Sequence, residues 1–231
     1  MTHRTTEARV ETITPITDSI LQLILAPDEY IDYQAGQYLQ MTAGTEPQSY
    51  SIANAPLGSH HYELHIRHKH DNLQNKELLT HIKHRGTVSI RLPLGTCDLN
   101  HLDPNKPILF LARGTGFAPI KAMIEQLLAD GGPRPFELYW GAHSQSDLYM
   151  DDKVLHWQAH VNHFQYLALS FDDSQDSLVS RAISRHPKDL VDWQIVFSGP
   201  FDMAHQTRDQ LLAAGASEQY LFSDAYTSEG E

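Results

Sequence analysis

The sequence predicts two fold classes in succession: an antiparallel β-barrel, then an α/β domain with a parallel sheet. Up to about residue 103, short runs of β-branched and aromatic residues alternate with turn residues, which is typical of small all-β domains. After Asp103, Pro104 and Asn105, apolar runs alternate with helical segments, the pattern of repeated βα units. We therefore expect one domain over residues 1–103 and a second over residues 104–231.

Six short strands and one helix are expected in the first domain. The first two strands lie within residues 7–26 and are joined near Thr17, Asp18 and Ser19. The later strands are predicted at residues 36–41, 50–53, 62–68 and 87–92, and the helix at residues 73–83. Strands this short, separated by frequent turn residues, indicate a small antiparallel barrel.

The second domain is predicted to alternate strands with helices. The strands are expected at residues 108–111, 136–140, 164–169, 195–197 and 220–222, and the helices at residues 117–128, 151–160, 178–185 and 201–213. Repeated βα units form a parallel sheet with helices on both faces. Ligands of such sheets bind outside the carboxyl ends of the strands, where two glycine-containing turns fall.

The first of these turns contains Gly114, Thr115 and Gly116. A helix starts directly afterwards at Phe117, with Pro119 in its first turn, where a missing N–H costs nothing. Free backbone N–H groups and the positive end of the helix dipole make such a turn an anion site. The alternative is an ordinary βα turn, because short glycine motifs recur by chance and Pro119 departs from the dinucleotide pattern G-x-G-x-x-G.

The second turn consists of Ser198, Gly199 and Pro200 and follows the strand at residues 195–197. Since both turns lie at the carboxyl ends of parallel strands, they share one edge of the sheet. Two glycine turns at that edge fit an extended ligand better than either turn does alone.

In the first domain, Gln48, Tyr50 and Ser51 lie close together near the predicted fourth strand. A planar ring can stack on the tyrosine while the serine hydroxyl donates a hydrogen bond at the ring edge. The alternative is an ordinary barrel strand with one inward-facing aromatic side chain.

Composition narrows the classes of function. A net charge of −12 argues against nucleic acid as the main partner, because phosphate contacts need a basic surface. Cys97 is the single cysteine, which excludes an intramolecular disulfide and a four-cysteine iron–sulfur cluster. No apolar run reaches membrane-spanning length, and the first ten residues contain no apolar stretch of a secretory signal. We therefore expect a cytoplasmic protein without a membrane span.

Fifteen histidines raise the question of a metal site. The densest group comprises His60, His61, His65, His68 and His70. No HExxH pattern or Cys/His ligand spacing accompanies them. A solvated polar strand face is the preferred interpretation, and no metal is predicted.

The order of these motifs resembles that of the ferredoxin–NADP⁺ reductase superfamily. The resemblance rests on Tyr50-Ser51, the turn Pro93-Leu94-Gly95, the stretch GTGFAP at residues 114–119, SGPxxM at residues 198–203 and LFSDAY at residues 221–226. Within the superfamily the chain is most similar to bacterial NAD(P)H–flavin reductases, which have no iron–sulfur domain. The resemblance covers nearly the whole chain, with several motifs in the expected order.

The resemblance implies a flavin-binding barrel at residues 1–103 and a nicotinamide-nucleotide domain at residues 104–231. It also implies that Ser51 lies near the reactive nitrogen of the flavin and acts in catalysis. The implied cofactor-binding residues are Gln48, Tyr50, Ser51 and Ile52 at the flavin, Gly114, Thr115, Gly116 and Pro119 at the nucleotide pyrophosphate, Gly199, Pro200 and Met203 beside the nicotinamide, and Asp224 and Tyr226 flanking the flavin.

Two departures from the superfamily pattern concern the flavin. Gln48 stands where an arginine usually clamps the flavin phosphate, and a neutral amide loses the charge-assisted contact. Residues 72–75 stand where a glycine–serine phosphate loop is usual. Both changes favour a loosely held flavin that acts as a substrate rather than as a prosthetic group.

Three departures concern the nucleotide. Arg113 replaces a small residue, and Ser198 replaces a cysteine that many members place near the nicotinamide. After the strand that ends at Trp140, only His143 offers positive charge, which favours NADH, or no strong choice, over NADPH.

We therefore expect an NAD(P)H:flavin oxidoreductase that transfers a hydride from NADH or NADPH to FMN, FAD or riboflavin. One alternative is an FAD-containing reductase that passes electrons to a partner protein such as an oxygenase or a ferredoxin. A second alternative is a catalytically degenerate member that binds nucleotide, since Gln48, Arg113 and Ser198 all depart from the pattern. The flavin preferred, the nucleotide preferred, the physiological acceptor and the oligomeric state are left open.

Overall fold

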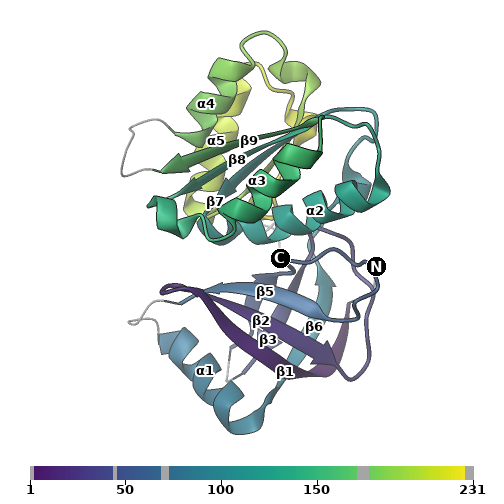
Figure 1. Ribbon diagram of the computed structural model, residues 1–231, viewed down its shortest axis with the longest axis vertical. Helices are drawn as coiled ribbons and strands as arrows, with labels where there is room; N and C mark the ends of the chain where they lie inside the picture. Colours follow the sequence, from purple (N-terminus) through teal and green to yellow (C-terminus); the bar gives the residue numbers. More distant parts are fainter. Residues whose placement is uncertain (1–2, 44–45, 69–72, 171–176, 227–231) are drawn as a thin grey trace. The chain divides into compact units, whose positions relative to one another are not determined.

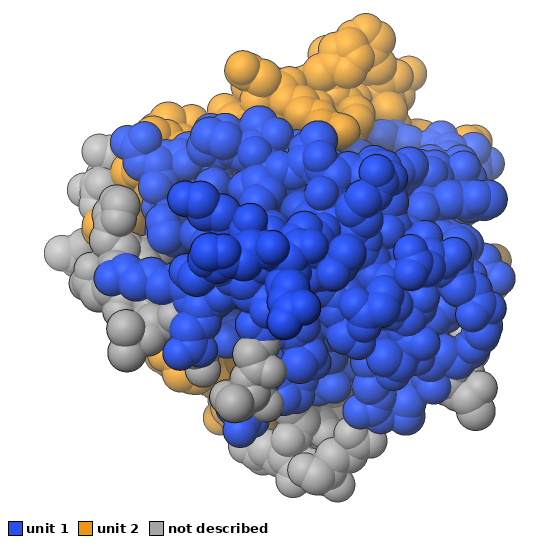
Figure 2. Space-filling view, turned by 90° about the horizontal axis from the view of Figure 1, so that it is seen from below, with its two compact units in different colours: residues 1–99, 118–130 blue, residues 100–117, 131–231 orange. Residues whose placement is uncertain are grey.

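The chain forms two compact units in the computed structural model, which describes residues 3–43, 46–68, 73–170 and 177–226, without the side chains of 73–75 and 226 (Figure 1). The β unit comprises residues 1–99 and 118–130, and the α/β unit comprises residues 100–117 and 131–231 (Figure 2). This division follows compactness, whereas the expected boundary at residues 103 and 104 divides the chain by cofactor and stays a prediction.

Within the described residues, the β unit contains a six-stranded antiparallel sheet in the order β4-β3-β6-β1-β2-β5. Its strands are β1 (Arg4–Thr17), β2 (Ile20–Pro27), β3 (Tyr38–Thr42), β4 (Gln48–Ser51), β5 (Tyr62–Arg67) and β6 (Thr87–Leu94). The helix α1 (Leu73–Arg85) lies between β5 and β6, and most of α2 (Phe117–Asp130) also belongs to this unit. The predicted strands, their antiparallel pairing and the helix are confirmed.

The two outer strands of the sheet, β4 and β5, are joined just beyond the end of β4. Ile52 forms an isolated bridge with Leu64, and the N–H of Ala53 donates to the carbonyl of Glu63 at 2.7 Å. Because this contact links the first strand of the sheet order to the last, the sheet curls into the predicted barrel.

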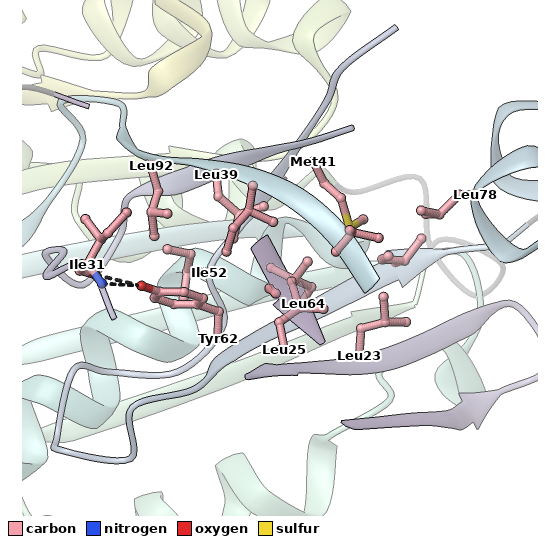
Figure 3. Packing of buried hydrophobic residues seen from close by; sticks show 14 of the residues in the cluster. Leu23, Leu25, Ile31, Leu39, Met41, Ile52, Tyr62, Leu64, Leu78 and Leu92 are labelled. Carbon is pink, nitrogen blue, oxygen red and sulfur yellow. Dashed lines mark hydrogen bonds between the residues drawn. The ribbon is translucent and has the colours of Figure 1, made fainter. Parts of the chain in front are cut away.

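The barrel core is made by alternate residues of its strands. Leu23 and Leu25 of β2, together with Leu39 and Met41 of β3, are almost completely buried, as period-two alternation requires (Figure 3). The phenol of Tyr62 donates to the carbonyl of Ile31 and accepts from its N–H, both at 2.8 Å, so this buried hydroxyl is satisfied (Figure 3). Helix α1 adds Leu78 and Ile82 to the same core.

The α/β unit contains, in the residues described, a five-stranded parallel sheet in the order β11-β10-β7-β8-β9. Its strands are β7 (Ile108–Arg113), β8 (Phe136–Ala142), β9 (Phe164–Ser170), β10 (Gln194–Ser198) and β11 (Leu221–Phe222), and its helices are α3 (Asp151–His160), α4 (Leu178–Arg185) and α5 (Phe201–Ala213). Helix α3 covers one face and helices α4 and α5 cover the other (Figure 1). This confirms the predicted parallel sheet.

Burial on both faces explains the continuous apolar run of β7. Ile108, Leu109, Phe110, Leu111 and Ala112 are all fully buried. Leu109 and Leu111 pack in a cluster with residues of α4 and α5, while the intervening side chains point to the opposite face. The central position of β7 in the sheet therefore places its carboxyl end, and the glycine turn that follows, between those of β8 and β10.

Among the residues described, no helix is both long enough and apolar enough to span a bilayer. The same part of the chain contains no group of three or more His, Cys, Asp or Glu side chains arranged to hold a metal ion. Of the histidine group at residues 60–70, His70 lies outside the described residues.

Candidate functional site

The first glycine turn is held in place by an aromatic side chain of the neighbouring strand. Gly114, Thr115 and Gly116 form a single 3₁₀ turn, and Gly114 has a φ of +56°, a left-handed conformation that favours glycine. The indole N–H of Trp140 donates to the Gly114 carbonyl at 3.0 Å. The ring of Phe117 stacks on the same indole with centroids 3.9 Å apart. The turn is therefore held by a hydrogen bond and by ring stacking that both involve Trp140 of β8.

The second glycine turn touches the first through its backbone. Ser198, at the end of β10, is in register with Ala112 of β7, so the two strands end side by side. A Cβ atom built on Gly116 would lie 2.1 Å from the Ser198 carbonyl oxygen and 2.8 Å from the Gly199 nitrogen. Only a residue without a side chain fits there. The structure thus brings the two predicted turns together and gives Gly116 a packing role that the sequence did not reveal.

Arg113 and Met203 lie beside this pair of turns. A Cβ atom on Gly199 would be 3.1 Å from the Cβ of Arg113, so the arginine side chain leaves β7 next to the second turn. Its Nη1 donates to the Met203 sulfur at 2.6 Å, in the first turn of α5. The cation therefore lies at the edge where both turns meet, which suits a phosphate-bearing ligand.

Tyr50 and Ser51 lie on β4, which forms one end of the strand order and pairs with β3. The Tyr50 hydroxyl donates to the Gln48 side-chain oxygen at 2.8 Å, and burial raises the pKa of Tyr50 to about 12. The phenol therefore stays neutral at physiological pH. Ser51 is partly exposed, and among the described residues its hydroxyl has no hydrogen-bond partner. It is available to a ligand.

Ile52 differs from its neighbours on the strand. Its side chain is fully buried in the barrel core, where it is seen beside Tyr62 in Figure 3. Its N–H donates to the Gln37 carbonyl at 3.0 Å. Any contact of Ile52 with a cofactor would therefore come from its main-chain carbonyl.

The remaining predicted residues lie near the ends of elements. Thr115 is the middle residue of the first glycine turn, and Pro119 is buried in the first turn of α2. Asp224, which is half-buried, opens a short 3₁₀ turn after β11, where the Ala225 N–H donates to the Ser223 hydroxyl at 3.3 Å. Tyr226 closes that turn, and its side chain lies outside the described part of the chain. The role expected for Asp224 and Tyr226 stays a prediction.

The β unit contains a buried ionic network that was not predicted from the sequence. Lys121 of α2 is 2% exposed, and its ammonium group lies 3.1 Å from Glu63 and 3.0 Å from Glu125. It also donates to the Ala53 carbonyl at 2.8 Å. The spacing of Lys121 and Glu125 by four residues was a sequence signal, but such pairs usually lie on a solvated helix face.

Glu63 is the centre of this network. Its other oxygen accepts hydrogen bonds from Gln22 at 2.7 Å and from His65 at 2.8 Å. Burial opposes ionisation of Glu63, but the hydrogen bond from His65 and the charge of Lys121 outweigh it, so the pKa of this carboxyl lies well below its usual range. Burial lowers the pKa of His65, and the neighbouring Glu63 carboxylate reverses only part of this lowering.

A second buried glutamate, Glu137, lies near the start of β8 in the α/β unit. It accepts from the Tyr139 hydroxyl at 2.8 Å and faces His186 at 3.1 Å and Arg185 at 3.3 Å. Burial would lower the pKa of His186, but hydrogen bonding to Glu137 and Asp189 prevails and raises it. The glycine turns follow the other end of the sheet, so this network is remote from them.

Comparisons with known proteins agree with this arrangement. The oxidoreductase NAD-binding domain family matches residues 110–209, which include both glycine turns. The chain is 33% identical over 212 residues to the CDP-6-deoxy-L-threo-D-glycero-4-hexulose-3-dehydrase reductase of Yersinia pestis, covering 90% of this chain and 64% of that protein. It is 27% identical over 234 residues to an NAD(P)H-flavin reductase of Vibrio harveyi, covering 96% of this chain and 98% of that protein.

Solved structures share the fold. A cytochrome P450 reductase of Amycolatopsis matches with a TM-score of 0.82 and 21% identity over 95% of this chain and 68% of its own. A ferredoxin NADP⁺ reductase of Neisseria gonorrhoeae with bound FAD and NADP matches with a TM-score of 0.78 and 16% identity over 94% of this chain and 97% of its own. Residues 110–209 thus match an oxidoreductase NAD-binding domain, the whole chain is similar in sequence to an NAD(P)H-flavin reductase, and its fold is that of a ferredoxin NADP⁺ reductase.

Proposed function

We propose that the protein is an NAD(P)H:flavin oxidoreductase that transfers a hydride from NADH or NADPH to FMN, FAD or riboflavin. The observation that carries the proposal is the backbone contact between Gly116 and Ser198, which joins two glycine turns at the carboxyl edge of a parallel sheet. Dinucleotides bind in the crevice outside the carboxyl ends of parallel strands, which is where both turns lie. The match to the Vibrio harveyi NAD(P)H-flavin reductase over almost the whole length of both proteins supports the flavin as acceptor.

The residues present fit the two cofactors. At the nucleotide, the first glycine turn offers backbone N–H groups to the pyrophosphate, and Arg113 adds a positive charge at the same edge. On β4, Tyr50 offers an aromatic face and Ser51 a hydroxyl group that can donate a hydrogen bond to a flavin ring. When bound, the nicotinamide supplies a hydride and the flavin accepts it; the protein binds and orients the two rings.

We propose further that the flavin is an exchangeable substrate. Gln48 is neutral, and its side-chain oxygen is already engaged by the Tyr50 hydroxyl at 2.8 Å. A position that usually clamps phosphate in the superfamily therefore carries no charge for that purpose. The second departure from the superfamily pattern falls on residues 72–75. Residue 72 and the side chains of residues 73–75 lie outside the described part of the chain.

We propose NADH, or no strong choice between the two nucleotides, because His143 is the sole basic residue of the segment 141–147 that follows Trp140. We place the protein in the cytoplasm, since a single cysteine fits a reducing compartment.

A second candidate function is that of a reductase component with bound FAD that passes electrons to a partner protein. The names of two relatives support it: the Yersinia pestis dehydrase reductase and a terephthalate 1,2-dioxygenase reductase component of Comamonas at 30% identity. The chain spans 64% of the length of each of these relatives. A protein that purifies with a stoichiometric yellow flavin would favour this candidate.

The proposed function is tested by steady-state NADH oxidation with FMN, FAD and riboflavin added in turn. We expect a rate that depends on added flavin and saturates with it. If neither NADH nor NADPH is oxidised with any of the three flavins, the proposal is wrong and the chain is a degenerate, nucleotide-binding member of its superfamily.

A further inference from the structure

Lys121 makes three polar contacts that together use the whole ammonium group. It donates to the Ala53 carbonyl at 2.8 Å and lies 3.1 Å from Glu63 and 3.0 Å from Glu125. With 2% of its side chain exposed, water cannot replace any of these partners. A lysine is almost never buried in this way unless it is fully paired.

The contacts of Lys121 converge on the segment that follows the proposed flavin strand. Lys121 holds the carbonyl of Ala53, while Glu125, one helical turn later, accepts from the N–H of Ala55 at 3.3 Å. Between them, the Asn54 side chain accepts from the Glu63 N–H at 2.8 Å. Residues 53–55 are therefore fixed by α2 on one side and by β5 on the other.

The carboxyl end of β4 is held by few main-chain contacts besides these: the Ile52 N–H donates to the Gln37 carbonyl at 3.0 Å, and the Ala53 N–H donates to the Glu63 carbonyl at 2.7 Å. The ladder of β4 with β3 ends at the pair Ser51 and Tyr38, and beyond it the bridge between Ile52 and Leu64 is a single one. Because the ladder ends at Ser51, the way in which residues 53–55 are held contributes to the position of Ser51.

We propose that Lys121 is a positioning residue for the flavin, which acts by fixing the backbone after Ser51 so that the Ser51 hydroxyl and the Tyr50 ring keep their places. The inference rests on the proposed function, because it takes β4 as the flavin-binding strand. Without Lys121, the carboxylates of Glu63 and Glu125 would be left without their shared cation, and the segment they also hold would shift.

The test compares Lys121→Met, which cannot donate a hydrogen bond, with Lys121→Arg, which keeps the charge. For Lys121→Met we expect the KM for flavin to rise about tenfold, because the Tyr50 ring is no longer held in its stacking position, with the KM for NADH unchanged. For Lys121→Arg we expect the flavin KM to return toward the wild-type value. A rise in the flavin KM of Lys121→Met without a rise in its NADH KM distinguishes a positioning role from a general loss of stability.

Glu137→Gln is the matched control, because it also removes a buried charge that pairs with a basic side chain, but in the α/β unit. It should lower the melting temperature while leaving both KM values as in the wild type. If Lys121→Met does not fold, Glu125→Gln takes its place as the test. This variant removes one negative charge but keeps a side-chain oxygen that can accept hydrogen bonds from Lys121 and from the Ala55 N–H. For that variant we expect a flavin KM about threefold higher.

The outcomes separate the inference from the function on which it rests. A folded Lys121→Met protein with a wild-type flavin KM overturns the role of Lys121 and leaves the proposed function standing. If Lys121→Met fails to fold, a wild-type flavin KM in Glu125→Gln has the same meaning. A wild-type protein that shows no saturable dependence on flavin overturns the proposed function and this inference with it. A flavin KM that rises equally in Glu137→Gln overturns the inference, because instability alone then explains the effect.

Discussion

The β unit and the α/β unit each contain a buried glutamate paired with a histidine, but the two pairs have different surroundings. Glu63 and His65 share their site with Lys121, which is 2% exposed. Glu137 and His186 share theirs with Arg185, whose side chain is 55% exposed. The first network adjoins the strand that we propose binds flavin, whereas the second lies at the end of the sheet remote from the glycine turns.

This comparison shows that the two units hold their proposed binding edges by different means. In the β unit, a buried cation and two carboxylates fix the backbone after β4. In the α/β unit, direct contact between two backbones, at Gly116 and Ser198, does so without any charge. The edge of the β unit should therefore respond to removal of charge, and the edge of the α/β unit to added volume.

The largest expected effect is the loss of stability in Glu63→Leu. The change leaves Lys121 buried with one fewer partner, and it should cost about 3–5 kcal/mol of the free energy of unfolding. Glu137→Leu should cost less, about 1–3 kcal/mol, because His186 can give up its proton and Arg185 can reach water. Urea denaturation of both variants measures the difference, and equal losses would contradict the distinction drawn between the networks.

Adding one methyl group at Gly116 should have the next largest effect. The Cβ of Gly116→Ala would lie 2.1 Å from the Ser198 carbonyl oxygen, so one turn must move, at about 1–3 kcal/mol. We also expect a higher KM for NADH with an unchanged KM for flavin. Gly132→Ala is the control, because nothing lies within 4 Å of a Cβ there. A Gly116→Ala protein with wild-type stability would show that the close contact between the two turns does not contribute to stability.

The two histidines should respond to pH in opposite directions. The pKa of His65 is lowered in the folded state, so the unfolded chain takes up a proton first and stability falls as the pH drops below about 6.5. The pKa of His186 is raised, so its contribution is present below about pH 6.5 and is lost as the pH rises through the folded-state value. NMR titration of both rings tests this, and a His186 pKa below that of His65 would refute it.

Ser51→Ala should have the smallest effect on stability, within about 0.5 kcal/mol, because the hydroxyl has no partner among the described residues. Its effect should be on rate: about a tenfold slower hydride transfer in a single turnover, with little change in flavin affinity. Ser49→Ala is the control, since that hydroxyl lies on the same face of β4 two residues earlier. Equal rates in Ser51→Ala and the wild type would place the reactive nitrogen elsewhere.

Much of the fold could be predicted from local patterns. The helices at residues 151–160, 178–185 and 201–213 have the bounds that their periodicity indicated. In α4, for example, the Ser177 side chain caps the helix by accepting from the Ser180 N–H at 3.1 Å, a purely local signal. Strand β7 was equally clear, because burial on both faces leaves a continuous apolar run.

The ionic network could not be predicted in this way, because its members come from separate elements. Lys121 meets Glu63 only after α2 packs on the barrel, and neither residue differs in sequence from one on a solvated surface. The need for glycine at position 116 could not be predicted either, because the Ser198 carbonyl that leaves no room for a side chain there belongs to another strand. The position of the two turns at one edge was predictable, because parallel strands share their carboxyl ends.

The most direct test of the account is whether the flavin exchanges. The purified protein is incubated with FMN, passed through a desalting column and assayed for NADH oxidation before and after flavin is added back. The account predicts a colourless, inactive fraction that regains full activity when FMN returns. A yellow fraction that oxidises NADH without added flavin would contradict it and would identify the flavin as a prosthetic group.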